Sequence, residues 1–241
     1  MKVKFALLSL LLLTGSALLA QTYGIQVIDT PTAFTLERGG YQVSFLGYED
    51  GGIEMKTIIG LHDSFFLGVS FNVDKAIGKG RAMANIPGVI ARIKIIDSGD
   101  FFPAIAVGYD SFYIGRYSER DDPDEEHNRI IFGPYVAFTS PIYLFGGEQY
   151  VNYGARLPVQ PHWEPNDASY FIGLDIPLGE YFRFKSEIER VFWNLRDSGD
   201  WLFNFGIRFS YMDQLGVEFA VMYDPGERLN RILRIEYRGQ F

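Results

Sequence analysis

Apolar and polar residues alternate along most of the chain after residue 40. In 201–211 (WLFNFGIRFSY), every odd-numbered residue is apolar or aromatic, whereas residues 204, 206, 208 and 210 are small or polar. The segments 67–74, 182–189 and 231–241 show the same spacing. Side chains of an extended strand point alternately to opposite faces, whereas a helix needs a period of about 3.6 residues. The pattern therefore predicts an all-β protein whose strands have one apolar and one polar face.

Turn residues divide this region into twelve predicted strands. The strands are expected at 40–48, 53–61, 65–75, 88–97, 102–112, 130–139, 143–155, 168–177, 182–193, 201–211, 215–224 and 231–241. Short connections are expected at 62–64, 98–101, 140–142, 178–181 and 212–214. Longer ones are expected at 76–87, 113–129, 156–167, 194–200 and 225–230, whereas 49–52 is short. Short turns at one end and long loops at the other are typical of bacterial outer-membrane barrels.

We therefore predict a transmembrane antiparallel β-barrel of about twelve strands over 40–241, with both chain ends in the periplasm of a Gram-negative cell. A soluble secreted β-sandwich is the alternative fold, because its strands also have one apolar and one polar face.

The last segment, 231–241, ends on an aromatic residue. Leu233, Ile235, Tyr237, Gly239 and Phe241 share one face. A final Phe with apolar residues at every second position before it resembles the closing strand of outer-membrane barrels, which the barrel assembly machinery reads. Tyr237 and Phe241 are therefore the candidate residues of the assembly signal.

Residues 1–20 have the features of a secretory signal peptide. Lys2 and Lys4 precede the apolar run 5–13, which is too short to span a bilayer, and small residues lead to Ala20. We expect 21–39 to form a periplasmic lead-in or a partial plug of the barrel. The chain has no cysteine, so strand pairing and burial alone must stabilise it.

Charge and aromatic content indicate the partners. Without Lys2 and Lys4, 20 basic residues remain against 30 acidic residues, a formal net charge of −10 that argues against nucleic acid. Aromatic residues gather near predicted strand ends, where they would form girdles at the membrane surface. They are Phe65, Phe66, Phe101, Phe102, Tyr143, Tyr181, Phe182, Trp193, Trp201 and Tyr211. We expect a location in the cell outer membrane, in contact with its lipid, lipopolysaccharide and the assembly machinery.

Charged residues on the polar faces are candidate lumen-lining residues. They are Glu54, Lys56, Asp74, Arg92, Lys94, Asp110, Asp175, Arg183, Lys185, Glu187, Glu189, Arg208, Glu218, Arg234, Glu236 and Arg238. The strand directions place mostly acidic side chains toward the outer half and mostly basic ones toward the periplasmic half, with Asp175 and Glu218 as exceptions. Such zones would bias which ions or sugars enter. Alternatively, the charges pair across strands and fill the interior.

Strand number leaves both possibilities open, because barrels of about 8 strands are filled by side chains and those of about 16 hold aqueous channels. We therefore expect a narrow or partly occluded polar pore.

No pattern indicates an enzyme. His62, His127 and His162 are the only histidines, and they fall in connections at opposite ends of the predicted barrel, which argues against a catalytic triad or a histidine metal site. The acidic loop 119–127 lacks the spacing and the central glycine of a calcium loop. We expect no enzymatic activity, no metal and no cofactor.

The first half of the chain resembles the YjbH-like outer-membrane proteins, which are linked to exopolysaccharide production. The residues that carry this resemblance are 30–33 (TPTA) and 102–110 (FPAIAVGYD). Asp110 follows Gly108 one residue earlier than in that family's pattern, and 111–113 replace a glycine-rich continuation. The resemblance implies an outer-membrane location and a part in polysaccharide passage.

These observations predict a porin-like transport protein, a narrow channel or export component for polysaccharide or a small polar, sugar-like solute. One alternative is a non-conducting structural or adhesive barrel that acts through its extracellular loops, chiefly 113–129 and 156–167. Another is a soluble secreted carbohydrate-binding sandwich.

Overall fold

The computed structural model describes residues 24–99, 102–111, 113–118, 126–130, 133–144, 147–157, 168–191, 200–223 and 229–241. The predicted signal peptide at 1–20 lies outside these ranges. Within them, no helix has the length and apolar character needed to cross a membrane.

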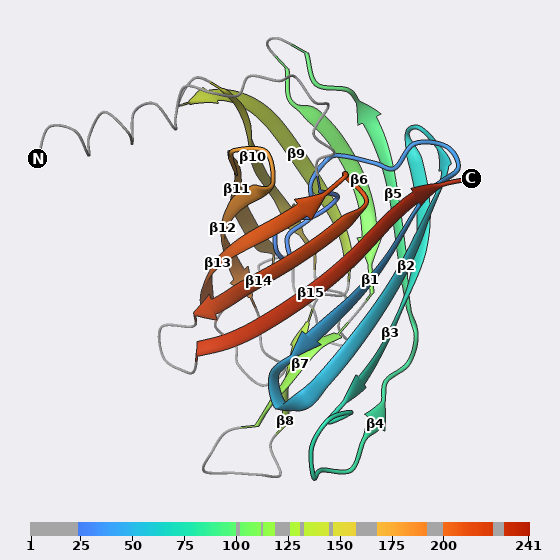
Figure 1. The fold of residues 1–241 in the computed structure, drawn as a ribbon, viewed down its shortest axis with the longest axis vertical. Helices are drawn as coiled ribbons and strands as arrows, with labels where there is room; N and C mark the ends of the chain where they lie inside the picture. Colours follow the sequence, from blue (N-terminus) through green and yellow to red (C-terminus); the bar gives the residue numbers. More distant parts are fainter. Residues whose placement is uncertain are drawn as a thin grey trace, which may run out of the picture.

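Twelve long strands form a closed antiparallel barrel (Figure 1). They are β1 (Gly40–Tyr48), β2 (Gly52–His62), β3 (Phe65–Asp74), β5 (Gly88–Ile96), β6 (Ala104–Asp110), β9 (Gly133–Leu144), β10 (Gly147–Arg156), β11 (Ser169–Leu178), β12 (Phe182–Val191), β13 (Asp200–Tyr211), β14 (Leu215–Tyr223) and β15 (Leu229–Gln240). Neighbours along the chain pair with each other, and β1 pairs with β15 from Gly40 opposite Gln240 to Gly47 opposite Leu233. This last pairing removes the sheet edge. The predicted fold is confirmed.

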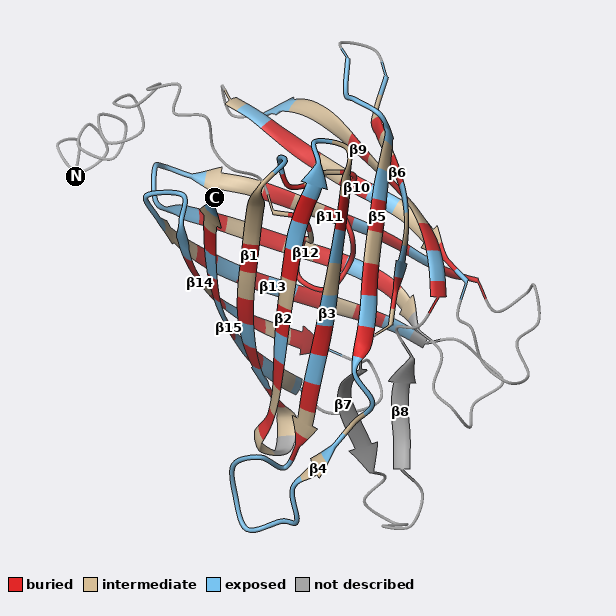
Figure 2. Cartoon of the chain, turned by 90° about the vertical axis from the view of Figure 1, so that its right-hand side faces the viewer, coloured by how far each residue is buried: buried red, intermediate tan, exposed pale blue. Residues whose placement is uncertain are grey.

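Short elements extend from the barrel at the end opposite Phe241 (Figures 1 and 2). They are the 3-10 turn η1 (Glu49–Gly51), β4 (Met83–Ala84), which pairs with the end of β3, and the hairpin of β7 (Tyr113–Ser118) and β8 (Glu126–Ile130). The sequence predicted only a loop at 113–129, so the β7–β8 hairpin corrects that prediction.

The predicted turn at 140–142 is wrong. Strand β9 continues through these residues to Leu144, and Pro141 lies opposite Tyr150 of β10. Beyond Thr139, which pairs with Ala104 of β6, β9 pairs only with β10 and is locally an edge strand. A proline lacks the N–H that a central strand needs but is tolerated at such an edge.

The strands alternate between buried and exposed residues, visible as colour bands along β1, β2 and β3 in Figure 2. The exposed positions are mostly large and apolar, such as Val69 and Phe219, which are 57% and 52% exposed. The buried positions are mostly polar or charged. This inverse pattern suits a barrel that meets lipid outside and has a polar interior.

Aromatic side chains are exposed near several strand ends, among them Phe102, Tyr143 and Tyr211. Phe66 corrects the girdle prediction, because its side chain is fully buried and lies beneath the guanidinium of Arg92, 4.9 Å from the ring centroid. In β3 the exposed apolar positions are odd-numbered, so position 66 belongs to the interior face. Phe101 and Trp193 lie outside the described residues.

Residues 24–36 fold into the interior of the barrel, where they are enclosed by the strands (Figure 1). The N–H of Val27 donates to the carbonyl of Thr30, and that of Thr32 donates to the carbonyl of Ile25, so the segment doubles back on itself. We call residues 24–36 the inner hairpin. Residues 37–39 join it to β1, and the N–H of Gly39 donates to the carbonyl of Gly60 at the end of the barrel where the chain enters.

Candidate functional site

The interior of the barrel gathers the charged residues of the chain. All of the predicted lumen-lining residues except Lys94 are buried there. Lys94 is half-buried near the end of β5 and pairs with the exposed Asp97. The buried candidates come from nine different strands, and the barrel brings them together because polar positions alternate with lipid-facing ones on each strand.

An ion-pair cluster lies toward the end of the barrel at which the last strand, β15, ends. The carboxylate of Glu236 accepts a hydrogen bond from Arg208 Nη2 at 2.6 Å and lies 2.9 Å from Arg238 Nε. Gln42 of β1 joins them, donating to Glu236 and accepting from Arg238. Nearby on β11 and β12, Arg183 Nε donates to Asp175 at 2.7 Å. Carboxylates therefore accompany the predicted basic zone.

A second cluster lies at mid-height. Glu218 accepts hydrogen bonds from Lys185 Nζ and from Arg234 Nη1, each at 2.6 Å. These three side chains come from β12, β14 and β15, and they are almost completely buried. Buried charges are retained only when they are paired and hydrogen-bonded, which this arrangement satisfies.

The part of the interior toward η1 and β4 contains further pairs. Arg156 Nη1 donates to Glu189 at 2.8 Å, and its Nη2 lies 3.6 Å from Asp110. Tyr48 donates to Asp74 at 2.6 Å. Lys56 lies 3.3 Å from Glu54. Pairs of opposite charge thus occur along the height of the interior, in place of separate acidic and basic zones.

Glu187 holds the tip of the inner hairpin. Its carboxylate accepts hydrogen bonds from three successive main-chain N–H groups, those of Ile28, Asp29 and Thr30, at 3.0 to 3.1 Å. It also accepts from the hydroxyl of Thr30 at 2.7 Å and from Asn204 of β13 at 2.7 Å. Successive N–H groups that converge in this way form an anion-binding nest.

Other wall side chains bind the carbonyls and one N–H of the hairpin. Arg92 Nη1 donates to the carbonyls of Ile25 at 2.7 Å and Phe34 at 2.8 Å. Lys185 Nζ donates to the carbonyl of Val27 at 2.6 Å. On β9, Thr139 accepts from the N–H of Ala33 at 2.8 Å. The barrel therefore recognises this segment chiefly through its main chain.

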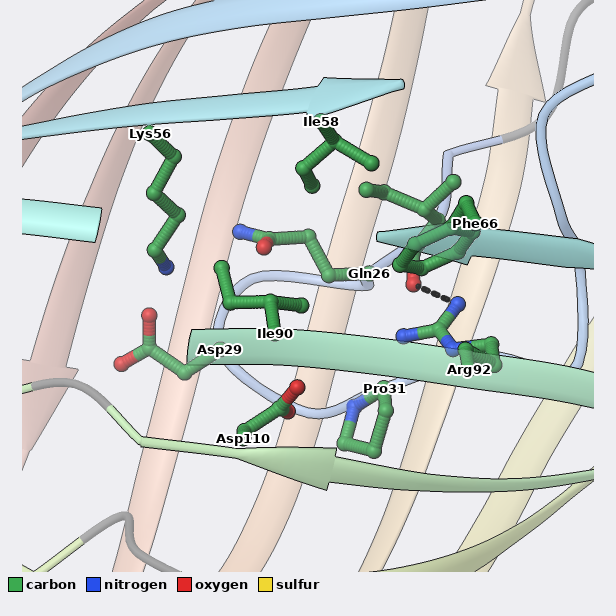
Figure 3. Close-up of a pocket in the computed structure, with 10 residues that line it drawn as sticks. Gln26, Asp29, Pro31, Lys56, Ile58, Phe66, Ile90, Arg92 and Asp110 are labelled. Carbon is green, nitrogen blue, oxygen red and sulfur yellow. Dashed lines mark hydrogen bonds between the residues drawn. The ribbon is translucent and has the colours of Figure 1, made fainter. Parts of the chain in front are cut away.

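A small cavity separates the hairpin from the wall formed by β2, β3, β5 and β6 (Figure 3). Its volume is about 10 Å³, which is room for about one water molecule. Asp29, Lys56 and Asp110 line it, and Figure 3 shows the Lys56 ammonium directed toward the Asp29 carboxylate. On its other side, Asp29 lies 3.4 Å from Arg234 Nη2.

No protein-family profile and no curated protein matches the chain. Among solved structures it is similar to the KdgM porin, with a TM-score of 0.53 and 11% identity over 82% of this chain and 98% of that chain. The KdgM porin in complex with disordered oligogalacturonate gives a TM-score of 0.53 and 11% identity, over 84% and 99% of the two chains. For the Acinetobacter baumannii outer membrane protein Omp33 the TM-score is 0.48 and the identity 8%, over 86% and 99%.

The chain has the fold of an outer-membrane β-barrel. This fold and its apolar outer face support the predicted location in the outer membrane. The YjbH-like resemblance and the assembly signal at Tyr237 and Phe241 stay predictions. Tyr237 and Phe241 are exposed and flank Tyr41, whose ring centroid lies 6.2 Å and 4.9 Å from theirs.

Sequence reasoning missed several interior residues of this outer-membrane barrel. The sequence predicts a loop from 156 onward, whereas Arg156 is the last residue of β10. Asp29 lies before the first strand, where no alternation signals burial. Gln42 and Thr139 carry no charge and were not considered, although both lie on polar faces of predicted strands. Within the part of the chain that the structure describes, no group of three or more metal-ligating side chains occurs.

Proposed function

We propose that the protein is a narrow outer-membrane channel for polar solutes and that the inner hairpin is its plug. The observation that carries the proposal is the position of the inner hairpin. This segment is not part of the barrel wall, but it fills the charged interior and is bound there through its main chain. Residues 37–39 are its covalent link to β1, so it can leave the lumen without unpairing a strand.

A sugar-like solute is consistent with this interior. Arginine, lysine and carboxylate side chains supply the hydrogen bonds that hydroxyl groups require. The structure of the KdgM porin, which has a similar fold, was solved in complex with oligogalacturonate, so a barrel of this kind accommodates a sugar oligomer. A part in exopolysaccharide passage, which the YjbH-like resemblance implies, belongs to the same proposal.

The second candidate is a non-conducting barrel that acts through its extracellular loops. The observation that favours it is the filling of the interior by ion pairs such as Lys185 with Glu218 and by buried apolar side chains of the hairpin, Val27 and Ile28. Single-channel conductance of the refolded mature chain in a planar bilayer separates the two candidates, with heat-modifiable migration in gels as the check of folding.

Replacing Arg183, Lys185 and Arg208 together by glutamine should shift the ion selectivity of the open channel toward cations, because three buried positive charges leave its wall. The matched control replaces Lys75, Lys79 and Arg81, which are exposed in the connection between β3 and β4, and should change selectivity far less. Unchanged selectivity in the first variant would contradict the pore-lining role. If neither the wild type nor any folded variant with a substitution in the inner hairpin conducts ions, the result would favour the non-conducting barrel.

A further inference from the structure

The tip of the inner hairpin has the chemical groups of a sugar acid. We infer that it occupies the binding site of such a solute, a small polyhydroxylated molecule with one carboxylate, which displaces the hairpin when it binds. This inference rests on the proposed channel function and names its solute class.

The wall side chains bind atoms that a solute could replace. Glu187 accepts from main-chain N–H groups, and Arg92 and Lys185 donate to main-chain carbonyls. None of these contacts requires a particular side chain on the hairpin. A carboxylate that accepts from several adjacent donors also suits the neighbouring hydroxyls of a sugar, because its two oxygens offer about four acceptor positions.

The tip presents a hydroxyl and a carboxylate on adjacent residues. The hydroxyl of Thr30 donates to Glu187 at 2.7 Å. The carboxylate of Asp29, which is 3% exposed, points the other way, to Arg234 Nη2 at 3.4 Å, with Lys56 across the cavity (Figure 3). A bound sugar acid would make the same arrangement: its hydroxyl would donate to a wall carboxylate, and its own carboxylate would lie beside a wall arginine.

Charge selects an anion over a neutral sugar. Two cations face the place that the Asp29 carboxylate occupies: Arg234 Nη2 lies 3.4 Å from it, and the Lys56 ammonium is directed toward it (Figure 3). When the hairpin leaves, Arg234 keeps Glu218 and Lys56 keeps Glu54, but both lose this further carboxylate. A solute with one carboxylate can take its place, whereas glucose has no such group.

The test is calorimetric titration of the refolded full chain in detergent with glucuronate, and with glucose as the neutral comparison. Asp29→Asn removes the competing carboxylate and leaves the wall intact. It should raise the affinity for glucuronate about tenfold, because the fraction of molecules with a vacated site increases. Glu37→Gln removes an exposed carboxylate of the adjoining link and should leave the affinity unchanged.

Thr30→Val, which removes the tip hydroxyl, should also raise the affinity, and Arg234→Gln should lower it. The two hairpin variants keep the test decisive if Arg234→Gln does not fold. Equal binding of glucose and glucuronate, or no change with Asp29→Asn, overturns the inference. Conductance is measured separately. A barrel that conducts ions but does not prefer glucuronate would support the channel and contradict the sugar-acid site. A barrel that binds glucuronate but does not conduct would contradict only the channel.

Discussion

At the scale of single residues, Glu236 is the carboxylate on which two buried arginines depend. Arg208 Nη2 lies 2.6 Å and Arg238 Nε 2.9 Å from the same oxygen of Glu236. Gly216 makes room for this cluster, because a Cβ at that position would lie 2.4 Å from Arg208 Nη2. A glycine and three charged side chains on β13, β14 and β15 thus form one packed unit.

Replacing Glu236 by glutamine should lower the free energy of unfolding by about 3 kcal/mol, because two buried guanidinium groups lose their carboxylate. Unfolding of the protein by guanidinium chloride in detergent micelles, followed by tryptophan fluorescence, measures this change in the free energy of unfolding. Glu37→Gln, at an exposed position, should stay within about 0.5 kcal/mol of the wild type. An equally small effect at Glu236 would mean that water or other side chains compensate the two arginines.

At the scale of elements, the link between the inner hairpin and β1 lies against β2. Gly60 lies under this link, and a Cβ there would lie 2.1 Å from the carbonyl oxygen of Glu37. The neighbouring turn contributes Asp63, whose Oδ1 accepts from the N–H of Arg38 at 2.9 Å. The link therefore has little freedom to move while it remains docked.

Gly60→Ala should displace the link and raise the open probability of the channel about tenfold. This increase corresponds to a loss of about 1.4 kcal/mol in the free energy that favours the docked hairpin over the displaced one. Single-channel recording gives the open probability directly. Gly147→Ala is the matched control, because nothing lies within 4 Å of a Cβ at that position. An unchanged open probability in folded Gly60→Ala would show that docking of the link does not govern opening.

The sequence could predict the long elements because the lipid and the interior impose opposite polarities on alternate residues. It misplaced the turn at Pro141 because turn chemistry is local. Proline is tolerated there because β6 begins only at Ala104, opposite Thr139, and leaves the rest of β9 unpaired on that side. The burial of Asp29 and the role of Glu187 in binding three N–H groups could not be predicted. Both depend on contacts between residues more than 150 positions apart.

At the scale of the whole molecule, the exposed apolar face forms a belt around the barrel. Phe219 lies at the middle of β14, and Tyr143 lies at the end of β9, where it is 78% exposed. A charge at mid-membrane costs far more than one near the surface, so position along a strand should determine the effect of a substitution.

Phe219→Arg should lower the free energy of unfolding in lipid vesicles by about 2–4 kcal/mol, and Tyr143→Arg by about 0–1 kcal/mol. Equilibrium unfolding of both variants in the same vesicles measures the difference. Equal costs at the two positions would place the membrane boundary elsewhere on the barrel.

The pairing of β1 with β15 has a consequence for biogenesis. The seam closes between the first and last strands, and the inner hairpin immediately precedes β1. If the hairpin folds inward as the seam closes, each new barrel enters the membrane already sealed. A cell that inserts many copies would then avoid leakage of ions and metabolites during insertion, without a separate factor to guard each unfinished pore.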